Sequence, residues 1–516
     1  MNNKQNNAVF YVSLIFVFAI VIWGIIAPNN FGTASNGLYE YLVDHFGWFY
    51  LLSMFALVVF SIVLAFSKYG SIKLGKDDST PDYSYISWFA MLFSAGMGIG
   101  LVFWGVAEPL NHFVVPLGAD PGTAAAADFA IKKSFFHWGL HPWANYSVLA
   151  LALAYFQFRK NKPGLISSIF IPLLGEDRVQ GPIGHVIDIL AIFATVAGVA
   201  TSLGLGTLQI NSGLNHMFNV PINNHTQIII IATVTVLFML SAVTGLDKGI
   251  KILSNTNLSL AALLMITALI LGPTVMIINS FTNGIGLYLG NLIRDSFHVE
   301  AFGDNSWFGG WTIFYWAWWI AWAPFVGTFI ARISKGRTIR EFIIGVLLVP
   351  ALGSFLWFAT FGTMGMNLGL ESATEAVATT ETAFFVVMSN YPLGGIISFI
   401  AVVLLCTFFV TSADSATFVL GMMSSNGDLN PSNKRKITWG IIQSLLALAL
   451  MLGGGLGTLQ TASIAAAFPF AIIMIFVMVS LVKALKEDSN EKAVKIEKGR
   501  SSLNRKLQIK TSIHRE

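Results

Sequence analysis

The chain has 516 residues, of which 55% are hydrophobic and only 11% are charged. Soluble domains carry about 25% charged residues, so this chain lacks the charge to cover a water-facing surface. Its mean hydropathy of +0.69 and its net charge of only +4 argue against a soluble enzyme, a disordered chain and a nucleic-acid binder. The single cysteine, Cys406, excludes an internal disulfide and a thiolate metal cluster. The composition therefore indicates an integral membrane protein.

Charge-poor apolar runs predict the membrane-spanning helices, because a bilayer core about 30 Å thick needs roughly 20 apolar residues per helix. About twelve such runs follow one another along the chain: 9–26, 48–66, 86–107, 135–158, 183–210, 228–243, 258–278, 311–330, 342–361, 396–422, 437–452 and 464–482. The first run lacks a small-residue cleavage site, so we expect a retained helix rather than a signal peptide. We expect an all-α integral membrane protein whose function lies within the membrane.

Lys and Arg accumulate in cytoplasmic loops, so their distribution predicts the orientation of the helices. The connections after even-numbered runs hold most of the loop Lys and Arg, whereas those after odd-numbered runs hold only Lys132, Lys133 and Arg294. This asymmetry predicts a multi-pass protein of the bacterial cytoplasmic membrane with both termini in the cytoplasm. The segment 283–298 is too polar to span and is typical of an amphipathic helix at the outer surface.

Two of the runs are interrupted near their middles, the third by Gly-Met-Gly-Ile-Gly at 96–100 and the eighth by Ala-Pro-Phe-Val-Gly at 323–327. They stand five helices apart, which is the pattern of two five-helix repeats of opposite orientation that bind substrate at broken helices. We therefore expect the following organisation: peripheral helices in 1–84, a transport core in 85–482 with repeats at about 85–280 and 305–482, and a basic cytoplasmic tail in 483–516.

Aromatic residues cluster on two of the predicted helices. At about 100° per residue, one narrow arc of the eighth helix carries Tyr315, Trp318, Trp319 and Trp322, and one arc of the fourth carries Trp138, Trp143 and Tyr146. Such rings are often lipid-facing or interfacial in membrane proteins. Clustered on two helices, they can instead form a box that recognises a quaternary ammonium group by cation–π attraction. A box without an acidic residue suits a cation that donates no hydrogen bonds.

Small and polar residues complete the candidate site. The glycines Gly96, Gly98 and Gly100 can expose backbone N–H groups and a positive helix end to a carboxylate, although they can also serve close helix packing. On the tenth helix, Thr411 and Ser412 offer oxygen ligands for a small cation, although such hydroxyls often bond their own helix.

Three further polar residues invite functional interpretation. Asp414 suits an ion site, a proton relay or a local cap, since a carboxylate within a membrane is costly. Glu108, before Pro109, is interpreted as structural. The pair His137 and His141 has the spacing of two metal ligands, but two ligands do not make a site, so no metal centre is predicted there.

At these residues the sequence resembles the betaine/choline/carnitine transporter family. The matching motifs are AGMGIGL at 95–101, HWGLHPW at 137–143, and YWAWWIAWAPFVG at 315–327 continuing to FIARIS at 329–334. The resemblance covers nearly the whole chain. It implies the five-plus-five inverted-repeat fold of sodium-coupled symporters, with two additional N-terminal helices, and assembly as a homotrimer.

The resemblance also implies roles for individual residues. It assigns an aromatic box to Trp138, Trp143, Tyr146 and Trp319, with Trp322 close to the substrate and Trp318 toward the cytoplasmic exit. It assigns one sodium site to Ser94, Met97, Phe408, Thr411 and Ser412. A second sodium site would use Thr195 and Phe325, but Val199 stands where the family has a further hydroxyl. Choline-carrying members tend to have Asp at the position of Gly100.

We therefore predict a secondary active transporter, not an enzyme, that imports glycine betaine by sodium symport, with sodium as coupling ion and no other cofactor. Alternatives are a choline or carnitine carrier, and proton coupling or exchange in place of sodium. A channel and a membrane-embedded enzyme are weaker rivals, because no continuous polar pore and no set of catalytic partners is visible. The expected partners are the quaternary-ammonium solute and membrane lipid, with anionic lipid at the basic tail; no nucleic acid is expected.

Overall fold

The computed structural model describes the backbone of residues 7–96, 98–244 and 247–513, and the side chains of residues 7–94, 98–243 and 252–490. Throughout this part of the chain the ordered elements are helices, and the only strand-like contact is an isolated antiparallel bridge between Lys73 and Thr338. The prediction of an all-α protein is confirmed. The helices of the first half are α1 (Ala8–Ile26), α2 (Pro28–Phe66), η2 (Lys68–Ser71), α3 (Tyr85–Gly96), α4 (Ile99–Val114), α5 (Ala124–Trp138), α6 (Leu140–Ala154), η3 (Tyr155–Arg159), η4 (Ser167–Phe170), α7 (Ile171–Leu174), α8 (Glu176–Val179), α9 (Pro182–Phe218) and α10 (Asn224–Thr244).

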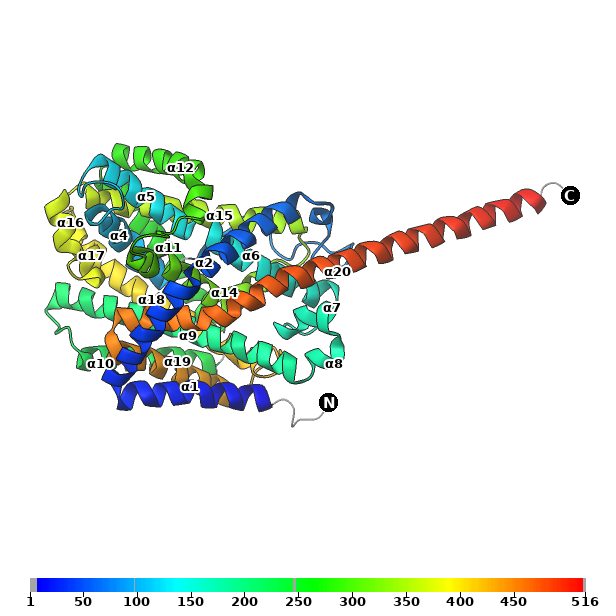
Figure 1. Cartoon of the computed structure of the whole chain (residues 1–516), viewed down its shortest axis with the longest axis horizontal. Helices are drawn as coiled ribbons and strands as arrows, with labels where there is room; N and C mark the ends of the chain where they lie inside the picture. Colours follow the sequence, from blue (N-terminus) through cyan, green and yellow to red (C-terminus); the bar gives the residue numbers. More distant parts are fainter. Residues whose placement is uncertain (1–6, 97, 245–246, 514–516) are drawn as a thin grey trace.

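The second half continues with helices of similar length. They are α11 (Asp247–Leu271), α12 (Thr274–Ser296), α13 (Ser306–Phe308), η5 (Gly309–Ile313), α14 (Phe314–Ile333), α15 (Ile339–Met366), α16 (Leu370–Val377), η6 (Thr380–Thr382), α17 (Ala383–Ser389), α18 (Gly394–Met423), α19 (Asn433–Gly454) and α20 (Leu456–Ile513). Figure 1 shows them gathered into one helical body from which the end of α20 projects.

Ten helical segments in the described chain are long and apolar enough to cross a membrane, and they include α1, α2, α9, α10, α11, α14, α15, α18, α19 and α20. The pair α3 and α4, which meet at 66°, supplies an eleventh. Large apolar side chains face outward on these helices: Ile26 is 77% exposed, Ile229 65% and Ile270 71%. A water-soluble body does not present so many bare aliphatic side chains, whereas lipid accommodates them. The chain is a multi-span membrane protein.

The fourth predicted helix is not one continuous span. The run 135–158 divides at Gly139 into α5, which begins earlier at Ala124, and α6. A Cβ added at Gly139 would lie 2.6 Å from the carbonyl oxygen of Phe135 and 2.7 Å from the hydroxyl of Tyr288, so only glycine fits this turn. Pro142, in the first turn of α6, lacks an N–H group and favours a new helix start there. The bend places Trp138 and Trp143 on either side of the turn.

One of the two predicted helix breaks is confirmed and the other is wrong. The third span is broken between α3 and α4 at the glycine motif. The eighth is unbroken at 323–327, because α14 runs through Pro324 to Ile333. Helix α14 is buried along most of its length and continues through the proline, and Asn145 Nδ2 donates to the carbonyl of Trp319 in the preceding turn at 2.8 Å. The irregular backbone of this span is instead the π-helical turn η5, Gly309–Ile313.

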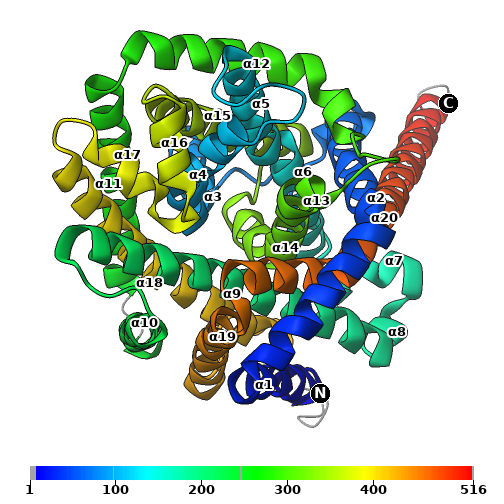
Figure 2. The ribbon, with the colours of Figure 1, turned by 60° about the vertical axis from the view of Figure 1, so that its left-hand side comes forward.

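Helix α14 occupies the centre of the molecule. It packs against α6, α9 and α20, and the side chains of Tyr315, Trp316 and Ile320 are fully buried. Helices α10, α11 and α12 lie toward the outside, and α12 crosses over α5 and α15 (Figure 2). The predicted amphipathic segment 283–298 is helical to Ser296 as the second half of α12. The predicted division into inverted repeats and peripheral helices stays a prediction.

Candidate substrate and ion site

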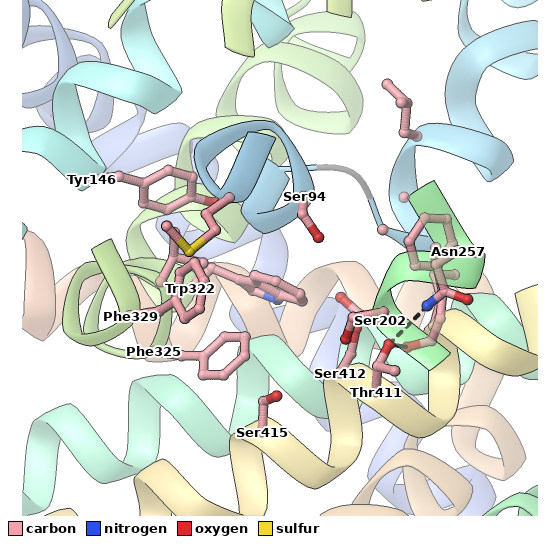
Figure 3. A pocket seen from close by; sticks show the side chains of 18 of the residues that line it. Ser94, Tyr146, Ser202, Asn257, Trp322, Phe325, Phe329, Thr411, Ser412 and Ser415 are labelled. Carbon is pink, nitrogen blue, oxygen red and sulfur yellow. Dashed lines mark hydrogen bonds between the residues drawn. The ribbon is translucent and has the colours of Figure 1, made fainter. Parts of the chain in front are cut away.

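A cavity of about 580 Å³ lies between α3, α4, α6, α9, α11, α14 and α18. Its wall is divided by chemistry, as Figure 3 shows: Tyr146, Trp322 and Phe325 lie on one side, and Ser202, Asn257, Thr411 and Ser412 lie on the other. The cavity has room for a solute of several heavy atoms together with water. The helix break between α3 and α4 borders it through Ser94, Gly98 and Gly100.

The aromatic wall brings together the residues predicted from the two helical arcs. Trp138 meets Trp319 with ring centroids 4.8 Å apart and planes at 77°, and Tyr146 meets Trp319 at 6.3 Å and 82°. Trp143 meets Tyr146 at 5.5 Å and 78°. All four rings line the cavity. Rings that are mutually perpendicular form the sides of a box, so a cation placed among them can meet several π faces at once.

The indole N–H groups of this wall are turned into the protein. Trp138 donates to Glu108 Oε2 at 2.9 Å, Trp319 to the carbonyl of His137 at 2.9 Å, Trp322 to the carbonyl of Gly198 at 2.7 Å and Trp318 to Ser202 Oγ at 3.3 Å. These bonds fix the ring orientations and use up the polar end of each side chain. The cavity therefore receives ring surface rather than hydrogen-bond donors from these four residues.

Trp318 lines the cavity but has a different environment from the box residues. Its ring lies parallel to that of Trp319, 4.8 Å away at 17°, and parallel to that of Phe314, 5.6 Å away at 11°. Its Cη2 edge points at Gly100, where an added Cβ would lie 2.5 Å away. Trp318 thus supports Trp319 and fills the space that the missing side chain of Gly100 leaves.

The two glycines at the start of α4 face the cavity in different ways. Gly98 is the N-cap of α4, and a Cβ added there would meet nothing within 4 Å. The first hydrogen bond of the helix runs from Leu101 N–H to the Gly98 carbonyl, so the N–H groups of Ile99 and Gly100 precede it. Gly96 is the last residue of α3. Met97, the predicted sodium ligand in this motif, lies outside the described residues.

The polar wall brings together four of the five residues predicted for the first sodium site. Ser94 of α3 and Phe408, Thr411 and Ser412 of α18 all line the cavity. The Thr411 hydroxyl lies 3.0 Å from the carbonyl of Thr407 one turn earlier, so part of its hydrogen-bonding capacity serves its own helix.

The sequence reasoning missed Asn257 of α11. Its Nδ2 donates to Thr411 Oγ1 at 3.1 Å, its side chain is only 2% exposed, and it lines the cavity (Figure 3). Its Oδ1 accepts no hydrogen bond from the described residues. Figure 3 shows the amide nitrogen of Asn257 turned toward Thr411 and its oxygen turned away, so Asn257 holds the Thr411 hydroxyl in place on the polar wall. The signal available in the sequence was the polar group Ser254, Asn255 and Asn257 at the start of an apolar run.

The second predicted sodium site gains no support from the geometry. Thr195 is fully buried and its hydroxyl donates to the carbonyl of Ala191 in its own helix at 2.8 Å. Val199, one turn later, offers no oxygen. Phe325 lines the main cavity next to Trp322, with centroids 5.4 Å apart.

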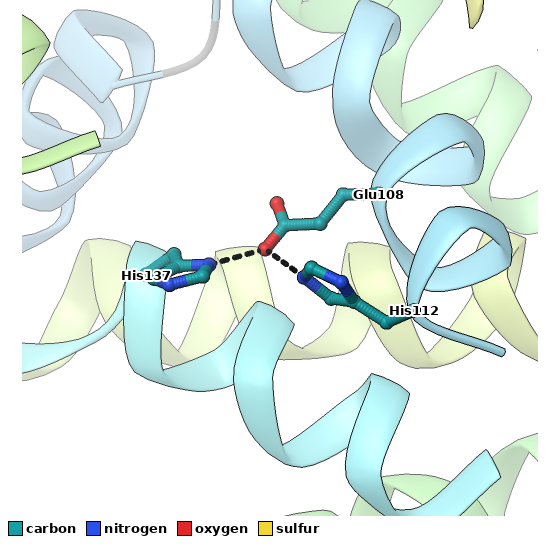
Figure 4. A group of neighbouring side chains, drawn as sticks. All are labelled: Glu108, His112 and His137. Atoms are coloured by element: carbon teal, nitrogen blue, oxygen red, sulfur yellow. Dashed lines mark hydrogen bonds and ion pairs between the residues drawn. The ribbon is translucent and has the colours of Figure 1, made fainter. Parts of the chain in front are cut away.

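Two buried polar groups near the box have clear partners. Glu108 contacts His137 (Figure 4), and directly behind the aromatic wall it also contacts Trp138 and Tyr315, although the sequence alone suggested a structural residue. His141 bonds Ser296 Oγ at 3.0 Å and so faces away from His137. The inner surface of the box therefore has no acidic residue among those described, but Glu108 lies directly behind it.

A multi-span helical protein with a ligand-sized cavity at a broken helix, lined by aromatic and hydroxyl groups, has the architecture of a membrane transporter. The sequence profile of the betaine/carnitine/choline family transporters matches residues 8–490. The chain belongs to this family. The family prediction is confirmed, and with it the prediction of a transporter rather than an enzyme.

Three relatives align with this chain along almost the whole of both sequences. The chain is 51% identical over 505 residues to the glycine betaine transporter OpuD of Bacillus subtilis, which covers 96% of this chain and 98% of the relative. It is 47% identical to a probable glycine betaine transporter of Desulfitobacterium hafniense, covering 94% and 99% of the two chains. It is 45% identical to an ectoine/hydroxyectoine transporter of Virgibacillus pantothenticus, covering 93% and 97%.

Proposed function

We propose that this transporter imports glycine betaine by sodium symport. The observation that carries the proposal is the box of Trp138, Trp143, Tyr146 and Trp319. A trimethylammonium group is a cation with a methyl surface and no hydrogen to donate. Its binding is stabilised by cation–π attraction to the ring faces, and it needs no hydrogen-bond partner from the protein. The names of two relatives, at 51% and 47% identity, support the same substrate.

The carboxylate of betaine would lie at the start of α4. There the N–H groups of Ile99 and Gly100 precede the first helical hydrogen bond, and the positive end of the helix dipole favours an anion. The open space at Gly98 lets the ligand approach the backbone closely. Choline shares the cationic head but ends in a neutral hydroxyl, so the difference between the two ligands arises at this end of the site.

Sodium would bind between the helix break and α18. We assign Ser94, Thr411 and Ser412 to this site, together with the carbonyl of Phe408 and with Met97, and we add Asn257 as the residue whose amide N–H holds the Thr411 hydroxyl in place. Sodium is a hard cation that takes oxygen ligands, and the hydroxyls on α3 and α18 and the carbonyl of Phe408 would provide them. Because the site borders the substrate cavity, ion binding would order the broken helix that also receives the carboxylate.

The 45% identical ectoine/hydroxyectoine transporter favours one second candidate substrate. Ectoine is also zwitterionic, but its cationic part carries N–H groups that need acceptors. The ring faces of the box provide none, so we rank ectoine below betaine. Choline and carnitine are rival substrates that share the quaternary ammonium group, and proton coupling or exchange would replace sodium symport.

The experiment is uptake into proteoliposomes of purified protein. Labelled betaine, choline, carnitine and ectoine are each offered with an inward sodium gradient and with potassium in its place. The proposal predicts accumulation of betaine only with sodium. Accumulation of another solute in preference to betaine, or equal uptake in potassium, would replace the substrate or the coupling ion respectively.

We further propose a homotrimer in the bacterial cytoplasmic membrane with both termini in the cytoplasm. The Lys and Arg residues of the loops support this orientation. The basic end of α20 would then lie beside the inner leaflet, where attraction to anionic lipid contributes roughly 1 kcal/mol per basic residue.

A further inference from the structure

Behind the aromatic wall, Glu108 of α4 is completely buried and accepts hydrogen bonds from three side chains. Its Oε2 receives the Trp138 indole N–H at 2.9 Å and the Tyr315 hydroxyl at 2.5 Å. Its Oε1 lies 2.6 Å from His137 Nδ1 (Figure 4). One carboxyl group thus links α4 to the end of α5 and to the start of α14.

The cluster also contains His112, whose Nε2 lies 3.4 Å from Glu108 Oε1. The three groups resemble a set of metal ligands, since their ligand atoms lie within 4.8 Å of one another. Ligands of one tetrahedral zinc ion, at bonds of about 2.0 Å, are about 3.3 Å apart. The 2.6 Å between Glu108 and His137 is the distance of a hydrogen bond instead. The far nitrogen of His137 is already paired with Thr312 Oγ1 at 2.9 Å.

The bond from Trp138 to Glu108 bears directly on cation binding. The bond holds the indole in one orientation, and it becomes charge-assisted, hence shorter and stronger, when the Glu108 carboxyl group is ionised. In a site of low dielectric, hydrogen-bonded groups also polarise each other. A carboxylate that accepts the indole N–H shifts electron density toward the ring, and this strengthens the attraction between its face and a cation.

We propose that Glu108 is the positioning residue of the aromatic box and supplies its counter-charge through Trp138. The inference rests on the proposed function in one respect, that the ligand carries a quaternary ammonium group. The box then has two layers. The inner layer consists of rings whose faces disfavour a solute that donates hydrogen bonds, and the outer layer is the Glu108 carboxyl group, which the ligand does not touch. The ring faces attract a cation without offering it a hydrogen-bond acceptor, and this favours quaternary ammonium solutes over protonated amines; among the box side chains the Tyr146 hydroxyl is the acceptor.

The test is a double-mutant cycle on betaine binding. Glu108→Gln keeps the size of the side chain, because its amide oxygen can accept from Trp138 and Tyr315 and its NH₂ group can face His137 Nδ1 after a tautomer change. We expect the betaine Kd to rise about tenfold while the melting temperature stays close to wild type. In the Trp138→Phe background, which has no indole N–H, Glu108→Gln should have little further effect.

A second comparison avoids changing the carboxyl group. Trp138→Phe and Trp143→Phe each keep an aromatic ring, but only the first breaks a bond to Glu108, so it should weaken betaine binding several-fold more. A matched stability control is Asp295→Asn, which breaks the buried pair of Asp295 with Lys133 on the same helix α5, at 3.1 Å. It should lower the melting temperature and leave the Kd unchanged.

The outcomes separate the proposed function from the role of Glu108. Wild-type protein that binds no quaternary ammonium solute would overturn the proposed function. Wild-type binding of betaine with an unchanged Kd in Glu108→Gln would overturn the role of Glu108 alone. That role is also overturned if Glu108→Gln behaves like Asp295→Asn, or if its effect is undiminished in the Trp138→Phe background.

Discussion

At the scale of single residues, the proposed recognition of the cation depends on the ring faces of the box. Trp319 touches both Trp138 and Tyr146 and stands at the middle of the aromatic wall. Replacing Trp319 by Leu removes a desolvated cation–π contact of about 2 kcal/mol, so betaine affinity should fall roughly thirtyfold. Trp319→Phe should cost less.

The control for Trp319 lies on the same helix. Trp316 is completely buried, and its ring stacks on His141 outside the cavity, 4.8 Å away. Trp316→Leu should reduce thermal stability and leave betaine affinity unchanged. Equilibrium binding of betaine to purified protein checks both variants. Wild-type affinity in Trp319→Leu would contradict cation binding by the box.

The glycines at the helix break test recognition of the carboxylate. Asp at Gly100 would collide with Trp318, since the added Cβ lies 2.5 Å from its ring, so that variant mixes steric and charge effects. Gly98 has open space and is the cleaner position. Gly98→Asp should weaken betaine about tenfold more than Gly98→Asn, because the two differ only in charge.

The readout for Gly98 is competition of unlabelled choline against labelled betaine. Choline carries a net positive charge, so it should compete better in Gly98→Asp than in wild type, and Gly98→Asn should show no such gain. Equal competition in all three proteins would place the carboxylate elsewhere.

At the scale of elements, α18 and α11 carry the polar wall on which we propose the ion site. Removing the hydroxyls of Thr411 and Ser412 by a double Ala substitution should raise the sodium concentration for half-maximal uptake at least tenfold. Asn257→Ala should act in the same direction but more weakly. Betaine recognition at saturating sodium should change little, because these groups lie on the wall opposite the box.

The matched control for the ion site is Thr407→Ala. Thr407 is one turn before Thr411 on α18, and its hydroxyl bonds the carbonyl of Val403 at 2.9 Å in the same helix. Uptake measured over a range of sodium concentrations should match wild type for Thr407→Ala. If all the variants shift together, the effect belongs to helix stability and not to ion binding.

The C-terminal helix yields a prediction about regulation. Asp488 of α20 accepts hydrogen bonds from Arg159 at 2.7 Å and from Lys160 at 3.0 Å, which fasten this helix to the end of η3. Beyond it, residues 491–516 hold eight Lys or Arg and three Glu. Truncation after Asn490 keeps the Asp488 contacts and removes this charge. Uptake should persist, while its dependence on osmolality or on anionic lipid should change.

Proteoliposomes with and without anionic lipid measure this effect over a range of osmolalities. Asp488→Asn in the full-length chain is the companion variant, since it weakens the attachment and leaves the basic tail in place. An activation curve that is identical in the truncated and full-length proteins would leave the tail with a role in topology only.

For the whole molecule, the sequence predicted what depends on composition and on helical periodicity. Apolar runs are sufficient to find most spans, and an arc of 100° per residue was enough to bring Trp143 and Tyr146 of α6 onto one wall. Trp138 joins them across the break at Gly139, where that arc does not apply. The predicted break at 323–327 failed because Pro324 alone does not end a helix that is buried along most of its length. The division of the fourth span depended on the close approach of Tyr288 to Gly139, which no local pattern reveals.

The contacts of Glu108 and Asn257 were not predictable for a related reason. Each partner lies on a helix distant in sequence: Tyr315 is 207 residues from Glu108, and Thr411 is 154 residues from Asn257. A buried polar group needs partners, and this can be expected from sequence. Which partners it finds depends on the packing of α4, α11, α14 and α18 together.

We propose above all that betaine enters with sodium through the cavity beside α14. The most direct measurement is uptake of labelled betaine into proteoliposomes of wild type, Trp319→Leu and Trp316→Leu, each with an inward sodium gradient and with potassium instead. We predict accumulation in wild type and Trp316→Leu with sodium only, and strongly reduced accumulation in Trp319→Leu at betaine concentrations near the wild-type KM. Equal betaine uptake in sodium and potassium, or full uptake by Trp319→Leu, would contradict the account.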